Sequence, residues 1–330
     1  MDEGCLDRAA GLIETAGVVG LACHVEPDGD ALGSLLALHH LCLAHGRTSV
    51  ASWPEPFVVA PHYTFLPGLD VCTKPADFPD EPDVMVTFDC GSLARLHELA
   101  APARRAAERG RLIVLDHHRT NDCYGAVNVI DPDAAATAVV VRRLAERLGW
   151  PLTRDAALCL YTGLVTDTGR FQYDATSPEV FRLAAELAAF GLPIPSMSRQ
   201  LFEEHRFEYL QLISTCLARA ELDRGLGLVA TWVTDDDLSV HGVTIQETEG
   251  LIDLVRRAKE ADVACVLKET PAGVRVSLRS VGTVDVSAIA LRFGGGGHAF
   301  ASGFIAPGPV DAVLADVRSS LAELRGGDGR

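Results

Sequence analysis

The residues of this 330-residue chain that are best suited to chemistry are Asp116, His117 and His118, which follow the apolar run Leu112–Leu115. Such a run is typical of a buried parallel strand, so a carboxylate and two imidazoles stand where that strand would end. Carboxylates and imidazoles occur at three further turns of this kind. These are His24, Asp28 and Asp30 after residues 18–23, Asp89 after residues 84–88, and Asp167 just before Thr168-Gly169.

Acids and imidazoles that converge from several turns would suit a hydrolase that uses two metal ions. Two divalent cations need several anionic oxygens, at least one of them bridging, and imidazoles favour borderline metals such as Mn²⁺ over Mg²⁺. Two ions about 3.5–4 Å apart can share a hydroxide, lower its pKa, and clamp the attacking and leaving oxygens at phosphorus. The candidate metal ligands are His24, Asp28, Asp30, Asp89, His117 and Asp167.

The coincidence of four such turns carries this prediction. An Asp-Gly-Asp turn or an Asp-Thr-Gly turn alone is more often a simple turn or helix cap. A pair of histidines is also common, and His39-His40 is a second pair with no evident role.

The elements that position these residues alternate β-rich runs with helical patterns, which predicts a doubly wound α/β fold with a parallel sheet. Expected strands span 18–24, 48–53, 84–89 and 112–116, and Asp30 is expected to cap a helix that stops at Gly46. Ligands bind beyond the carboxyl ends of strands in such sheets, so side chains distant in sequence can meet there. Asp167 instead follows a helical stretch, 154–165.

A second, smaller α/β domain is predicted in the last third of the chain. Ser177 and Pro178 have the types expected at a helix start, and Gly191 to Pro195 would end that helix. We therefore assign residues 1–190 to a first, metal-binding domain, 191–222 to a linker with a connecting helix over 201–222, and 223–330 to a second domain. Its expected strands are 227–234, 263–268 and 274–279, and its expected helices are 248–259 and 310–324.

Composition and charge exclude several classes of protein. A hydrophobic content of 48% indicates a globular chain, and no apolar stretch reaches the roughly 18 residues of a membrane span. The acidic start Met1-Asp2-Glu3 does not resemble an export signal, so we expect a cytoplasmic protein. The nine cysteines contain no C-x-x-C pair, which argues against a thiolate zinc site. A net charge of −16 argues against coating of long nucleic acid, although bound metals would still allow a short anionic substrate.

These motifs together resemble the DHH phosphoesterase family, in particular its hydrolases of short oligonucleotides (nanoRNA) and of adenosine 3′,5′-bisphosphate. The stretch from His24 to Ser34 resembles the first family motif, and Asp89 with Ser92 and Arg95 the second. Asp116-His117-His118 resembles the third motif, and 163–171 the fourth. Residues 294–303, with Gly294–Gly297 and His298, are similar to the nucleotide-binding signature of the associated C-terminal domain.

The resemblance implies a role for each residue. One metal would be held by His24, Asp28 and Asp89, and the other by Asp30, Asp89, His117 and Asp167, so that Asp89 bridges. Asp116 would support the site, and His118 would contact the scissile phosphate. Two metal ions are implied, with Mn²⁺ preferred and Mg²⁺ or Co²⁺ as alternatives.

Substrate binding is expected in the second domain. Strict alternation over 274–279 places Arg275, Ser277 and Arg279 on one strand face, and Arg279 would grip a phosphate by a bidentate bond. Gly295 and Gly296 would let the backbone approach the ligand, and His298 would add a polar or stacking contact. The alternative for the strand is that its polar face is simply solvated. The alternative for the glycine run is that it forms only a flexible turn.

The resemblance implies an enzyme that cleaves very short RNA or DNA from an end and dephosphorylates adenosine 3′,5′-bisphosphate. A cyclic dinucleotide phosphodiesterase acting on cyclic di-AMP is the alternative within the family, and an inactive nucleotide sensor is the alternative outside enzymes. A homodimer is suggested by resemblance only. The basic groove of long-strand exonucleases and the C-terminal Ser-Arg-Lys cluster of the family's pyrophosphatases are not seen in the sequence.

Overall fold

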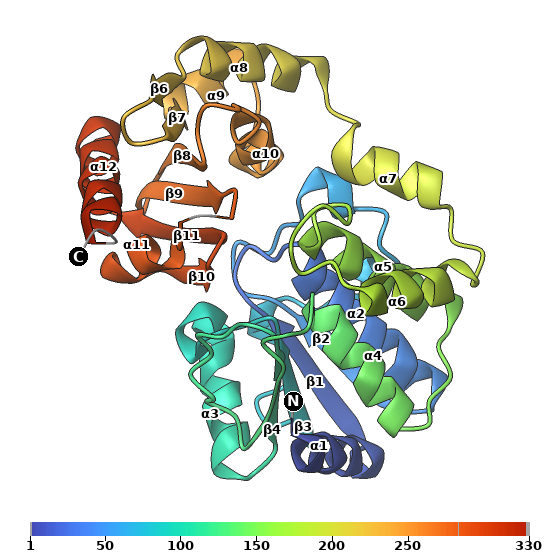
Figure 1. Ribbon diagram of the computed structural model, residues 1–330. Coiled ribbons are helices and arrows are strands. Elements are labelled where there is room, and N and C mark those ends of the chain that lie inside the picture. The colour runs from blue at the N-terminus through green and yellow to red at the C-terminus, as the bar shows by residue number, and fades with distance from the viewer. Residues whose placement is uncertain (1, 283, 328–330) are drawn as a thin grey trace. The chain divides into compact units, whose positions relative to one another are not determined.

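A computed structural model describes residues 2–282 and 284–327. The chain divides into two compact units between Leu201 and Phe202. In the first unit, five parallel strands form one sheet in the order β2-β1-β3-β4-β5 (Figure 1). The strands are β1 (Val18–Cys23), β2 (Thr48–Ser52), β3 (Val84–Phe88), β4 (Leu112–Asp116) and β5 (Val127–Ile130).

Helices cover both faces of this sheet, with α3 on one side and α2 and α4 on the other (Figure 1). The predicted doubly wound fold is therefore confirmed. The helices are α1 (Glu3–Thr15), α2 (Gly29–Ala44), α3 (Ala100–Glu108), α4 (Thr137–Arg147), α5 (Arg154–Asp167), α6 (Pro178–Ala188) and α7 (Ile194–Phe202). Short 3-10 turns lie at Pro61–Tyr63, Leu69–Val71, Pro75–Asp77 and Leu93–Leu99.

The strand order determines where a ligand can bind. Strands β3 and β4 are fully buried, as their continuous apolar runs predicted. In the order 2-1-3-4-5, chain connections run in opposite directions from β1 and β3, and a crevice opens beyond the carboxyl ends of these two strands. His24 and Asp89 are the first residues after β1 and β3, so they stand at the mouth of this crevice.

The cap of α2 differs from the prediction. Asp28, rather than Asp30, is the N-cap residue, because its Oδ1 atom accepts hydrogen bonds from the amides of Asp30 and Ala31, both at 3.1 Å. Asp30 lies in the first turn and is fully buried, so its carboxylate is available for contacts with other elements. Two acids at i and i+2 can both cap a helix, and only the backbone geometry distinguishes them.

Helices α2 and α5 pack so closely that side chains are excluded at their crossing. A Cβ atom on Gly33 would lie 2.4 Å from the carbonyl oxygen of Cys159 in α5. A Cβ atom on Gly163 would lie 2.7 Å from Oδ1 of Asp30. These two glycines therefore bring the end of α5, which carries Asp167, against the start of α2.

The second unit contains a six-stranded mixed sheet in the order β10-β11-β9-β8-β7-β6. Only β7 and β8 are parallel neighbours, and the other pairs are antiparallel. The strands are β6 (Glu221–Asp223), β7 (Leu228–Val233), β8 (Val263–Thr270), β9 (Gly273–Ser280), β10 (Gly296–His298) and β11 (Ala301–Ala306). The helices are α8 (Phe207–Ala218), α9 (Asp235–His241), α10 (Leu251–Val255), α11 (Ser287–Arg292) and α12 (Val310–Gly327).

The two faces of this sheet are covered to different extents. Val274, Val276 and Leu278 of β9 pack in a core with residues of α11 and α12. On the opposite face, residues of α8 and α10 pack against β7 and β8, and the core there includes no residue of β9 or β11. Arg275, Ser277 and Arg279 are half-buried on that face, as the alternation predicted.

Some predicted elements of this region were wrong. The helix expected over 201–222 is the shorter α8, because residues 221–223 pair with β7 as a strand instead. The helix expected over 248–259 is reduced to a 3-10 turn at Ile245–Thr248 and the short α10. The separate linker over 191–222 stays a prediction, since the contact-based division falls at residue 201. No helix within the described ranges is long and apolar enough to cross a membrane.

Candidate metal centre

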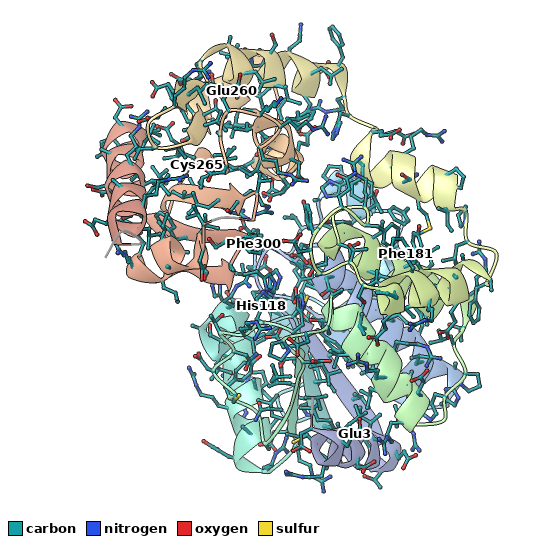
Figure 2. The ribbon with its side chains drawn as sticks, in the orientation of Figure 1. Glu3, His118, Phe181, Glu260, Cys265 and Phe300 are labelled. Carbon is teal, nitrogen blue, oxygen red and sulfur yellow. The ribbon has the colours of Figure 1, made fainter. Side chains whose placement is uncertain are left out.

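The candidate residues of the first unit gather beyond the ends of three neighbouring strands. His24 follows β1, Asp89 follows β3, and Asp116 ends β4. Figure 2 labels His118, which lies beyond the end of β4 among many side-chain oxygen and nitrogen atoms. Because parallel strands end at one edge of the sheet, side chains up to 94 residues apart reach one place.

Asp89 lies at the centre of the cluster. Its backbone is left-handed, with φ of 52°, which Asp tolerates better than most residues and which turns the chain sharply after β3. Oδ2 lies 3.7 Å from His24 Nε2, and Oδ1 lies 3.5 Å from His117 Nε2. The two carboxylate oxygens therefore face two different imidazoles. This is the arrangement expected of a carboxylate that bridges two metal ions, each of which also binds one imidazole.

The first group of candidate ligands surrounds His117. Its Nε2 atom lies 3.1 Å from Asp167 Oδ2, 3.5 Å from Asp89 Oδ1 and 3.9 Å from Asp30 Oδ2. Its Nδ1 atom lies 3.1 Å from the carbonyl oxygen of Ala134, which only accepts hydrogen bonds. A proton on Nδ1 leaves the lone pair on Nε2, which is the tautomer that a metal requires.

The second group contains His24, Asp28 and Asp89, whose ligand atoms lie within 4.8 Å of one another. His24 Nε2 lies 4.0 Å from Asp28 Oδ2, and the Asp28 side chain is about half exposed. His24 Nδ1 lies 2.8 Å from the carbonyl oxygen of Val25 and 3.0 Å from Nη2 of Arg95. A guanidinium only donates and a carbonyl only accepts, so the two contacts need opposite states of Nδ1; the proton donated to Val25 is the one that leaves the Nε2 lone pair for a cation at the exposed side of the cluster.

Asp116 differs from the other acids because its oxygens already have donors. Oδ1 accepts from the amides of His117 and His118, at 2.7 and 3.1 Å, and from His118 Nδ1 at 2.7 Å. Oδ2 accepts from Asn121 Nδ2 at 2.5 Å. This buried carboxylate therefore supports the loop and orients His118, and it has little capacity left for a metal.

The pKa values in the cluster reflect strong mutual interaction. Burial opposes charge on His117, but Asp167 and Asp89 raise its pKa well above 6.5. Burial likewise opposes charge on Asp89, yet His118, His117 and His24 hold its pKa well below the usual range. Burial and the nearby Asp89 and Asp167 raise the pKa of Asp30 well above its usual value. Without a metal, protons on imidazoles and carboxyls therefore balance the charge.

The donor set fits divalent cations. Within residues 2–282 and 284–327, no lysine or arginine forms an ion pair with Asp30, Asp89 or Asp167, and imidazoles are their only ion-pair partners. Asp30, Asp89 and His117 are nearly fully buried, and their ligand atoms lie within 4.8 Å of one another. Buried acids without a fixed counter-charge are unfavourable, and a bound cation would supply that charge.

Comparison with known proteins agrees with this geometry. Residues 19–164 match the DHH family, N-terminal domain, and residues 229–323 match the DHHA1 domain. The chain is 33% identical over 313 residues to the bifunctional oligoribonuclease and PAP phosphatase NrnA of Thermus thermophilus, covering 92% of this chain and 90% of that protein. The chain belongs to the DHH family. The family predicted from the sequence is thereby confirmed.

Two further matches extend over nearly the whole DHH chain. The bifunctional oligoribonuclease and PAP phosphatase NrnA of Bacillus subtilis is 26% identical over 310 residues, with 91% of this chain and 93% of that protein covered. The crystal structure of an exopolyphosphatase-related protein from Bacteroides fragilis has a TM-score of 0.88 and 25% identity, with coverage of 98% and 96%. Both matches therefore extend over both units of this chain.

The predicted substrate-binding residues lie in the DHHA1 unit. Arg279 is half-buried on β9; its Nη1 donates to the carbonyl of Leu278 at 3.1 Å, while Nε has no hydrogen-bond partner among the described residues. His298 is half-buried on β10. A Cβ atom on Gly295 would lie 2.2 Å from the carbonyl oxygen of Gly303, whereas one on Gly296 would meet no atom within 4 Å. Gly295 therefore allows close packing against β11, whereas Gly296 faces open space.

Sequence reasoning missed several residues that hold this DHH centre together. Asn121 fixes Asp116, and Thr137 donates to both Asp30 and Asp89. Ser34 donates to Asp30 from the next turn of α2, at 3.2 Å. Ser34 lies in the first motif and could have been found at i+4 from the acid, but Asn121 and Thr137 gave no signal in the sequence.

Proposed function

We propose that this DHH-family chain is a metal-dependent phosphohydrolase that degrades very short oligonucleotides from an end to mononucleotides. We also propose that it dephosphorylates adenosine 3′,5′-bisphosphate. The Thermus and Bacillus relatives are both named as bifunctional oligoribonuclease and PAP phosphatase, and they match over nearly their whole length. These names agree with the enzyme class predicted from the sequence, a phosphohydrolase.

The observation that carries the proposal is the position of Asp89 between two groups of ligands. His24 and Asp28 lie toward its Oδ2 atom, and Asp30, His117 and Asp167 belong to the group on the side of Oδ1. We assign these six residues as ligands of two divalent ions. Mixed imidazole and carboxylate ligands favour Mn²⁺, with Mg²⁺ or Co²⁺ as alternatives.

The protein's own groups would hold the phosphate in place. When bound, two divalent ions would acidify an attacking water and offset charge on the phosphate. His118 Nδ1 is engaged with Asp116, so Nε2 can donate to a phosphate oxygen. Burial opposes charge on His118, but Asp116 and Asp89 raise its pKa, which favours the protonated form that such a donor needs. Asp116, fixed by Asn121, would keep this imidazole oriented.

We assign recognition of the rest of the substrate to the second unit. Arg279 would bind a phosphate, Gly296 and the neighbouring Gly295 would line the approach of the ligand, and His298 would contact a base or phosphate. In this proposal residues 1–190 form the catalytic domain, 191–222 connect, and 223–330 bind substrate. Action in the cytoplasm, and a homodimer as the assembly, also stay predictions.

The direct test is an assay of the purified chain. A linear adenylate dinucleotide, adenosine 3′,5′-bisphosphate and cyclic di-AMP are each incubated with Mn²⁺, Mg²⁺ or Co²⁺, and nucleotide products are separated by chromatography. We expect metal-dependent release of AMP from the first two substrates. A large preference for the ring would replace this proposal with a cyclic dinucleotide phosphodiesterase. Tight nucleotide binding with no turnover on any substrate would instead indicate a sensor.

A further inference from the structure

One fully buried residue contacts both central acids of the metal centre. Thr137, the first residue of α4, is 0% exposed. Its backbone N–H donates to Asp30 Oδ2 at 2.6 Å, and its hydroxyl donates to Asp89 Oδ1 at 3.0 Å. These acids are 59 residues apart in sequence. Thr137 therefore links the start of α2 to the end of β3 through two separate donors.

The two oxygens that Thr137 contacts are the ones that face His117. Asp30 Oδ2 lies 3.9 Å and Asp89 Oδ1 3.5 Å from His117 Nε2. The other oxygens have different surroundings: Asp30 Oδ1 accepts from Ala138 N and Ser34 Oγ, and Asp89 Oδ2 faces His24. The donors of Thr137 are thus concentrated on one of the two groups of ligands.

Counting lone pairs shows what these hydrogen bonds do. A carboxylate oxygen has about two acceptor positions. Asp30 Oδ1 uses both, so Oδ2, which among the described residues accepts from Thr137 N alone, is the oxygen that can still bind a cation. Asp89 Oδ1 accepts from the hydroxyl of Thr137, and His118 Nδ1, 3.4 Å away, makes its short hydrogen bond to Asp116 at 2.7 Å instead, so Asp89 Oδ1 also keeps one position. The two donors leave one free lone pair on each oxygen.

The position of Thr137 is itself fixed by the fold. Helix α4 has Ala136 at its N-cap position, with no side-chain cap hydrogen bond. Asp30 of α2 takes the role of the cap, because it accepts from the amides of Thr137 and Ala138, at 2.6 and 2.9 Å. The Thr137 hydroxyl is therefore held on a rigid helix start, which suits a residue that orients ligands.

We propose that Thr137 is a positioning residue of the metal centre. Its amide and hydroxyl orient Asp30 and Asp89 so that one free oxygen lone pair of each is directed to the cation beside His117. The proposal rests on the ligand assignment under the proposed function. It concerns metal affinity, so it can be tested without any knowledge of the substrate.

The test compares two substitutions that separate the hydroxyl from the methyl group. Thr137→Val keeps the shape and removes the donor, whereas Thr137→Ser keeps the donor and removes a methyl group. Metal-free protein is titrated with Mn²⁺ by calorimetry, and its melting temperature without metal is recorded. Thr162→Val is the matched control, because Thr162 is also fully buried but donates only to the Leu158 carbonyl of its own helix, at 3.0 Å.

We expect Thr137→Val to weaken the binding of one Mn²⁺ ion by roughly 10- to 100-fold, the range typical of residues that orient metal ligands. Thr137→Ser and Thr162→Val should bind Mn²⁺ like the wild type. A role in packing alone would give the opposite order, with Ser the more damaging change at position 137. Wild-type affinity in Thr137→Val, or equal loss in Thr162→Val, would overturn the proposal. Failure of the wild type to bind any Mn²⁺ would instead refute the metal centre itself.

Discussion

The metal centre of the first unit and the half-buried face of β9 in the second unit hold their polar residues in different ways. In the metal centre, Asp30 accepts three hydrogen bonds from buried donors, and Asp116 accepts four from buried or part-buried donors. On β9, Arg279 donates to a neighbouring carbonyl, and its Nε lacks a partner among the described residues. A site that is fixed before the substrate arrives suits chemistry common to all substrates. The less constrained guanidinium of Arg279 can instead adapt to different substrates.

The largest effect is expected from Asp89→Ala, which removes the acid shared by both groups of ligands. Activity on every substrate should fall by well over the roughly 100-fold that loss of an orienting residue causes. Bound Mn²⁺, measured by elemental analysis after dialysis, should fall in parallel. Asp155→Ala, at the exposed start of α5, is the control and should change neither quantity. Nucleotide binding and a biological effect that survive without turnover would favour a sensor.

A smaller and substrate-dependent effect is expected from Arg279→Ala. Loss of charged hydrogen bonds worth about 1.5–3 kcal/mol should lower kcat/KM on the dinucleotide by roughly 10- to 100-fold, mainly through KM. Mn²⁺ affinity should stay at the wild-type value, and so should hydrolysis of a minimal substrate such as bis(p-nitrophenyl) phosphate. Arg292→Ala, which breaks the exposed pair with Glu323, is the control. Equal losses on the minimal substrate would contradict the division of roles between the two units.

The response to pH should distinguish the metal centre from the rest of the molecule. The pKa of His117 is raised in the folded protein, so its protonated form stabilises the metal-free protein fully below its ordinary value of 6.5. This contribution is lost as pH rises through the folded-state pKa. In EDTA, the melting temperature should therefore fall by several degrees as the pH rises above about 6.5.

Added Mn²⁺ should reverse this trend, because the ion replaces the proton on His117. The gain in melting temperature with Mn²⁺ should accordingly grow with pH. Asp167 and Asp89 both raise the His117 pKa, so Asp89→Ala should make both curves shallower, and the double substitution with Asp167→Ala should flatten them. A metal-free protein that becomes more stable as pH rises across this range would contradict the assigned charges.

The smallest effect on catalysis is expected from Gly296→Ala. The added methyl group meets open space, so the fold should persist and only KM should rise, as nucleotide titrations would detect. Gly295→Ala is the informative partner, because its Cβ would lie 2.2 Å from the Gly303 carbonyl. We expect a loss of stability of about 1–3 kcal/mol from this overpacking, measured by denaturant unfolding. A rise in KM from Gly295→Ala at unchanged stability would place the ligand contact there instead.

Much of the first unit could be predicted because buried parallel strands leave continuous apolar runs in the sequence. The ends of the predicted strands over 18–24 and 84–89 differ from β1 and β3 by a single residue each. β5 was missed because only four residues form it, and two of them are half-buried. In the second unit, β10 was missed because two of its three residues are glycines.

The candidate site could be predicted as a set of residue types but not as a set of contacts. Asp28 and Asp116 look alike in sequence, yet both oxygens of Asp116 accept hydrogen bonds from neighbouring donors, whereas only Oδ1 of Asp28 does among the described residues. Thr137 follows three alanines and resembles an ordinary helix start. Its contact with Asp30 depends on how α4 is placed against α2, and local sequence does not encode that placement.

The hydrogen bonds between Asp30 and the first amides of α4 also bear on how activity should be judged from such sequences. A descendant that had abandoned metal chemistry would still benefit from an acid at position 30, because without it the helix would lose its cap. Asp167 has no comparable structural duty, since the one ion pair of its side chain within the described ranges is with the metal-ligand candidate His117. Retention of Asp167 would therefore be the more telling sign that a related chain still works as an enzyme.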